Sequence, residues 1–128
     1  MESGAMLVMR YAGFFDHLRG ADLVITGQGR VDLQTAGGKL CSVVARESRR
    51  AGIPVALLAG AFGEGGAEQA DFDALRSAFD YAVSICNGEI GLDAMLRNGE
   101  RNLKLAAENL IRAIQIGKKL NGKRINKV

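Results

Sequence analysis

Short runs of apolar residues alternate along the chain with longer stretches in which apolar residues recur at helical spacing. Three continuous apolar runs, Leu23–Thr26, Val55–Ala59 and Tyr81–Ile85, are typical of strands that are covered on both faces of a sheet. Glycine follows the first two runs, and Pro54 opens the second. The pattern therefore predicts three short strands.

Helical periodicity precedes, separates and follows these runs. The first helix is expected over 5–19, with Gly13 as its weak point, and the second over 39–51, ending at Gly52. A helical segment is expected around 72–79. From Gly91 onward the pattern predicts one short and one long helix, with the break at Asn98-Gly99.

This order of elements predicts an α/β fold, with three layers (α/β/α) and a short, mostly parallel sheet. The chain has 128 residues, of which 48% are hydrophobic and 24% charged, so we expect one domain over 1–128 with an ordinary core. A sheet of three strands has two edges to protect. We therefore expect another domain or another chain to complete it.

Composition excludes several classes of function. The formal net charge is +3, and much of it lies in the tail 117–124, which we interpret as a solvated terminus and not a nucleic-acid site because only 5% of residues are aromatic and none is Trp. No apolar run is long enough to predict a membrane helix. Cys41 and Cys86 lack metal-site spacing and are expected to be reduced thiols. We expect the protein in the cytoplasm.

The segment after the first strand carries the candidate chemistry. It reads Thr26-Gly27-Gln28-Gly29-Arg30, and two glycines so close together predict a sharp turn whose N–H groups can approach an anion. The segment is not a dinucleotide fingerprint, because Asp32 stands where the third glycine belongs. Nor is Gly37-Gly38-Lys39 part of a Walker motif, since its spacing and the residue after the lysine are wrong.

Five polar residues follow within ten positions of that turn: Arg30, Asp32, Gln34, Thr35 and Lys39. Arginine and lysine neutralise phosphate oxygens, and an aspartate accepts a hydroxyl proton or holds Mg²⁺, so the set has the parts of a phosphoryl-transfer site. An ordinary polar loop, with Asp32 paired to Arg30 and Lys39 solvated at a helix start, explains the same residues. The sequence leaves both interpretations open.

Two other features favour structural roles. The second glycine-rich segment, 60–66, is interpreted as a flexible connector in preference to a lid. His17 is the only histidine and has no placed serine or cysteine partner, so a histidine-based catalytic triad is not expected.

The stretch from Ala21 to Thr35, continued by Gly38-Lys39, resembles the signature of the bacterial glycerate kinase family. The resemblance extends through Ala51–Gly60 and, more loosely, into the helix that contains 102–107. It covers nearly all of this chain but only the C-terminal part of the family's much longer members.

The resemblance implies ATP- and Mg-dependent transfer of a phosphoryl group to a hydroxyl of D-glycerate. By position it implies Asp32 and Lys39 as catalytic residues, with Asp32 also the Mg²⁺ ligand. Seven further residues would bind substrate or nucleotide: Thr26, Gly27, Gln28, Gly29, Arg30, Gln34 and Thr35. The implied partners are glycerate and ATP, together with a complementary N-terminal segment or a homo-oligomer.

The chain departs from the family pattern at two places. Gln28 stands where the family usually has glutamate, and Leu40-Cys41 replaces a common apolar-proline pair. A neutral amide is a weaker metal ligand and base than a carboxylate. The larger departure is extent: because the chain resembles only the C-terminal part of longer proteins, we expect activity to need an N-terminal portion as well. The alternative is a non-catalytic fragment that binds an anion or nucleotide weakly, or self-associates.

Overall fold

The computed structural model describes residues 3–31, 40–62, 77–86 and 91–124. The chain divides into two compact units, Met1–Ser84 and Ile85–Val128, and we describe each by itself. The prediction of one domain over the whole chain stays a prediction.

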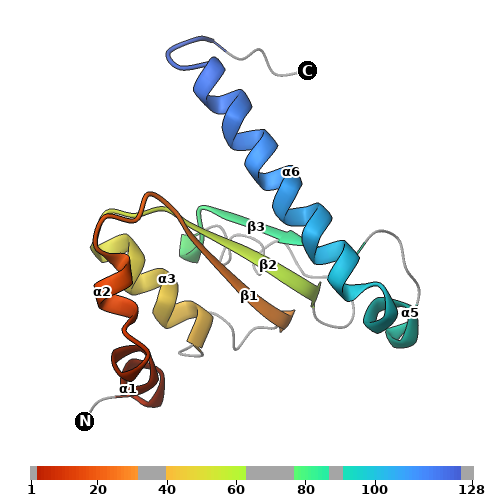
Figure 1. Ribbon diagram of the computed structural model, residues 1–128, viewed down its shortest axis with the longest axis horizontal. Coiled ribbons are helices and arrows are strands. Elements are labelled where there is room, and N and C mark those ends of the chain that lie inside the picture. The colour runs from red at the N-terminus through yellow and green to blue at the C-terminus, as the bar shows by residue number, and fades with distance from the viewer. Residues whose placement is uncertain (1–2, 32–39, 63–76, 87–90, 125–128) are drawn as a thin grey trace. The chain divides into compact units, whose positions relative to one another are not determined.

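The first unit is built around a three-stranded parallel sheet (Figure 1). Its strands are β1 (Val24–Val31), β2 (Val55–Phe62) and β3 (Tyr81–Ser84), in the order β1-β2-β3. β2 pairs in parallel with both neighbours. The predicted α/β fold with a short parallel sheet is confirmed.

Two strands are longer than their apolar runs. β1 continues to Val31 and β2 to Phe62, with Gln28 paired to Ala59 and Arg30 to Ala61. Neither Gly27 nor Gly29 has a positive φ angle. The predicted sharp turn at Gly27–Gly29 is therefore wrong: pairing with β2 holds this segment as extended strand in spite of its glycines.

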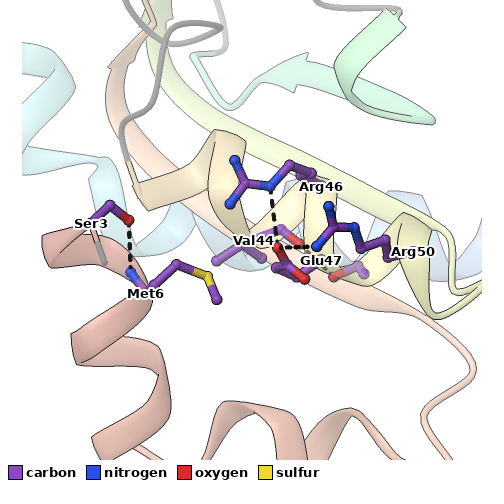
Figure 2. Close-up of polar contacts among 7 residues, drawn as sticks. Ser3, Met6, Val44, Arg46, Glu47 and Arg50 are labelled. Carbon is purple, nitrogen blue, oxygen red and sulfur yellow. Dashed lines mark hydrogen bonds and ion pairs between the residues drawn. The ribbon is translucent and has the colours of Figure 1, made fainter. Parts of the chain in front are cut away.

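The predicted helix over 5–19 is two helices, α1 (Gly4–Tyr11) and α2 (Phe14–Leu18). They separate at Gly13, whose φ of 75° a helix does not allow. The Ser3 hydroxyl caps α1 by accepting a hydrogen bond from the Met6 N–H at 3.2 Å (Figure 2).

The connecting helix α3 (Leu40–Arg50) ends close to where the sequence predicts. Gly52 has a φ of 75°, its N–H donates to the Arg49 carbonyl at 3.0 Å, and the Ile53 N–H donates to the Ser48 carbonyl at 2.9 Å. These two bonds form a Schellman motif, which stops the helix and sends the chain into β2.

α3 lies on one face of the sheet, against β1 and β2 (Figure 1). Two clusters of buried apolar side chains fix it there. One joins α3 to β2 and to the segment just before β3: Cys41, Ala45, Val55, Leu57, Ala59 and Phe79. The other joins α3 to α1: Met9, Val43 and Val44. Among the described residues, Phe79 is the largest fully buried side chain.

One carboxylate is buried on α3. The side chain of Glu47 is 8% exposed, and its Oε1 atom accepts hydrogen bonds from Arg46 at 3.2 Å and Arg50 at 3.5 Å (Figure 2). Both arginines are largely exposed. The buried carboxylate of Glu47 is thus paired with two arginines that reach it from the exposed side of α3.

The second unit contains α5 (Leu92–Arg97) and α6 (Gly99–Lys119), and the break at Asn98-Gly99 is confirmed. Lys118 and Lys119 lie in the last turn of α6, so part of the basic tail is helical. No helix in the described part of the chain is long and apolar enough to cross a membrane. Of the helix predicted over 72–79, residues 72–76 lie outside the described part.

Candidate functional site

The candidate site lies at the carboxyl ends of β1 and β2. The two strands are parallel and in register up to Val31 and Phe62, so both glycine-containing segments approach the same edge of the sheet. Ligands of open α/β sheets bind outside this edge.

Only part of the predicted site falls within the described residues. Thr26, Gly27, Gln28 and Gly29 lie on β1, and the backbone of Arg30 pairs with Ala61. The remaining four predicted site residues, Asp32, Gln34, Thr35 and Lys39, lie outside the described residues. Their meeting at this edge stays a prediction.

Thr26 points toward α3. Its Oγ1 atom is 3.4 Å from the Cys41 Sγ atom, and the Cys41 thiol donates to the Gly27 carbonyl at 3.2 Å. A thiol has one hydrogen, so the Thr26 hydroxyl is the donor in its contact with sulfur. A short chain of hydrogen bonds therefore joins the first turn of α3 to the middle of β1.

Gly27 and Gly29 leave the backbone of β1 without side-chain cover. Both are exposed. A Cβ atom at Gly29 would meet no described atom within 4 Å, and one at Gly27 would meet only the Leu58 carbonyl oxygen at 3.5 Å. Among the described residues, no side chain blocks the approach of an anion to Gly29, and only a backbone oxygen lies near Gly27.

Gly60 of β2 has no room for a side chain beside β1. It lies between Ala59 and Ala61, whose partners are Gln28 and Arg30, and is therefore opposite Gly29. A Cβ atom at Gly60 would be 2.4 Å from the Gly29 carbonyl oxygen. No real Cβ atom tolerates that distance, so the approach of the two backbones requires glycine here.

Sequence reasoning did not identify Cys41 or Gly60 as part of the site. The sequence analysis expects Cys41 only to be a reduced thiol, and Gly60 only to begin a connector. The available signal for Gly60 was a glycine directly after each of two parallel apolar runs. The thiol contact had no sequence signal, because it depends on how α3 docks on the sheet.

A pocket and a metal site are two further features to consider besides this edge of the sheet. A pocket of about 560 Å³ is at the opposite end of the strands, lined by Phe15, Leu18, Arg19, Gly20, Ala51 and Ile53. Among the described residues no three His, Cys, Asp or Glu side chains gather as a metal site. The predicted Mg²⁺ ligand, Asp32, is outside that part of the chain.

Comparison with known proteins decides the family. The model of the glycerate kinase family matches residues 1–115. The chain belongs to this family. The glycerate kinase of Halalkalibacterium halodurans is 36% identical over 84% of this chain and 27% of its own length. That of Haemophilus influenzae is 32% identical over 89% of this chain and 29% of its own.

A solved structure of a glycerate kinase family protein has the same fold. The crystal structure of a protein assigned as glycerate kinase 2 from Salmonella typhimurium superposes with a TM-score of 0.67 at 29% identity. It covers 93% of this chain and 29% of its own. The chain thus spans less than a third of the length of these relatives, in keeping with a resemblance to one part of the family's proteins.

Proposed function

We propose that this chain contributes one wall of a glycerate kinase site, in which the γ-phosphoryl group of ATP is transferred to a hydroxyl of D-glycerate with Mg²⁺. Family membership and the bare backbone at Gly27 and Gly29 support the proposal. A complementary N-terminal segment would supply the other wall, since the relatives are more than three times as long as the part that matches. We place the reaction in the cytoplasm.

Each predicted site residue has a role in this proposal. Gly27 and Gly29 let the anionic groups of the ligand approach β1, while Thr26 and Gln28 shape the strand beside them. Lys39 neutralises phosphate charge, and Asp32 holds Mg²⁺ or accepts the proton of the attacking hydroxyl. Three residues orient the ligand: Arg30, Gln34 and Thr35. Mg²⁺ would supply charge stabilisation on the phosphate oxygens.

The test is a coupled assay of ADP release with ATP, Mg²⁺ and D-glycerate. The chain is assayed alone and together with the separately expressed remainder of the Halalkalibacterium halodurans glycerate kinase, whose intact enzyme is the positive control. We expect turnover in the mixture and a loss of about 100-fold or more in the Asp32→Asn variant. Turnover that is unaffected by Asp32→Asn would remove Asp32 from the mechanism.

The alternative is a non-catalytic fragment that binds an anion or nucleotide weakly, or self-associates. The small share of each relative that the chain matches favours this alternative for the chain alone. Calorimetric titration with Mg-ATP and with D-glycerate separates the two proposals. A catalytic wall binds both ligands measurably, whereas a fragment of the alternative kind does not bind both.

A further inference from the structure

We infer that Cys41 and Gly60 are positioning residues for the ligand-binding segment Thr26–Gly29. Cys41 holds it by hydrogen bonds from α3, and Gly60 on β2 leaves room for it, without either residue touching a ligand. This inference rests on the proposed function and names two residues through which that site acts.

On the α3 side the contact is polar and largely shielded from water. Cys41 is 6% exposed and belongs to the cluster that joins α3 to β2. Its thiol donates to the Gly27 carbonyl and accepts from the Thr26 hydroxyl, so two successive residues of β1 are fixed by one sulfur atom. The hydrogen bond from Cys41 directs the carbonyl of Gly27 toward α3 and restrains the Gly27–Gln28 peptide plane.

On the β2 side the contact is steric. Because a Cβ atom at Gly60 would be 2.4 Å from the Gly29 carbonyl oxygen and 3.3 Å from its carbon, any larger residue must push the Gly29 peptide away. Gly29 has no described neighbour on its open side to resist that shift. The displaced peptide belongs to one of the two glycines that the proposed function places beside the ligand.

The two contacts concern the carbonyls of Gly27 and Gly29, in an extended segment that is also paired with β2. Glycine loses more backbone freedom on folding than other residues, so Gly27 and Gly29 gain from restraint beyond that pairing. An anion-binding backbone must be in place before the ligand arrives to bind it well. Cys41 adds such restraint, and Gly60 leaves the room that the Gly29 carbonyl occupies.

The first experiment compares Cys41→Ser with Cys41→Ala. Serine keeps a donor and acceptor at this place, and alanine removes both. We expect Cys41→Ser to bind Mg-ATP within about twofold of the parent and Cys41→Ala to bind roughly fivefold more weakly. If Cys41 only fills space, alanine is tolerated at least as well as a buried hydroxyl. Equal binding by both variants would overturn its positioning role.

The second experiment is Gly60→Ala, with Gly4→Ala as the matched control. A Cβ atom at Gly4 meets no described atom within 4 Å, and Gly4 begins α1 on the same unit. We expect Gly60→Ala to weaken Mg-ATP binding about tenfold or more, and Gly4→Ala to leave it unchanged. Unchanged binding in folded Gly60→Ala would contradict the steric argument.

Amide hydrogen exchange of a peptide containing Thr26–Gly29 tests the positioning by Cys41 and Gly60 separately from ligand binding. We expect exchange to accelerate about tenfold in Cys41→Ala and Gly60→Ala, but not in Cys41→Ser. If the parent chain binds neither Mg-ATP nor D-glycerate, the proposed function fails for the chain alone, and exchange still decides the positioning. An exchange rate equal to that of the parent in both Cys41→Ala and Gly60→Ala would contradict the inference. If Gly60→Ala does not fold, the comparison of Cys41→Ala with Cys41→Ser decides it.

Discussion

Glu47 occupies a position that proteins usually give to an apolar side chain. Its carboxylate is 8% exposed, but Arg46 and Arg50, which bind it, are 54% and 73% exposed. Burial of the carboxylate costs solvation energy, and exposed partners return little of it. Removal of the charge leaves both arginines in water, where they need no replacement partner.

We therefore expect Glu47→Met to change the free energy of unfolding by less than about 1 kcal/mol, and to raise it if packing is good. Urea denaturation followed by circular dichroism measures this. A loss of more than about 2 kcal/mol would mean that the ion pairs are a net source of stability.

Replacement of Phe79, unlike replacement of Glu47, is expected to lower the stability of the protein strongly. It is 1% exposed and packs in the cluster with Cys41, Val55 and Leu57. Phe79→Ala removes a ring from this core, and we expect it to lower the free energy of unfolding by about 3–5 kcal/mol. Tyr11→Ala, at a site 86% exposed, serves as control and is expected to change it by less than about 0.5 kcal/mol. A loss below about 1 kcal/mol at Phe79 would contradict the described core.

At the scale of elements, two glycines near helices have opposite roles. Gly52 ends α3 with a φ of 75°, whereas Gly117 lies inside α6, where a Cβ atom would meet no described atom within 4 Å. We expect Gly52→Ala to destabilise the protein by about 1 kcal/mol and Gly117→Ala to stabilise α6 by up to about 1 kcal/mol. Thermal unfolding and helical content by circular dichroism report both. A stability change of the same sign in Gly52→Ala and Gly117→Ala would contradict these opposite roles.

Helix ends were predictable where residues close in sequence fix them. Gly52 and Asn98-Gly99 were identified from sequence, because the backbone conformation that ends each helix depends on only a few neighbouring residues. The extension of β1 through Gly27 and Gly29 was not, since glycine disfavours strands and only pairing with β2 overrides that preference. The contact of Gly60 with Gly29 joins segments far apart in sequence. The roles of Asp32 and Lys39 stay predictions.

For the whole molecule, the main fact is that the chain matches less than a third of each relative. Several large apolar side chains on α1 are exposed: Leu7 at 46%, Val8 at 58% and Tyr11 at 86%. On a complete protein such a group usually packs against something. Within the described residues, β1 and β3 also pair only with β2.

We expect the chain alone to associate as its concentration rises through the micromolar range. Analytical ultracentrifugation measures its mass, and the double variant Val8→Glu, Tyr11→Glu is expected to lower that mass toward one chain. Arg10→Glu, on the same helix, controls for added negative charge. Monomeric behaviour of the parent chain at about 100 μM would contradict the expectation.

The close approach of Gly29 and Gly60 has a consequence for how the sheet assembles. If β2 slid by one residue against β1, Ala59 or Ala61 would face the Gly29 carbonyl, and a methyl group would occupy space that the oxygen already fills. Misaligned pairings are thus penalised during folding, and a single residue without a side chain helps to fix the register of the two strands.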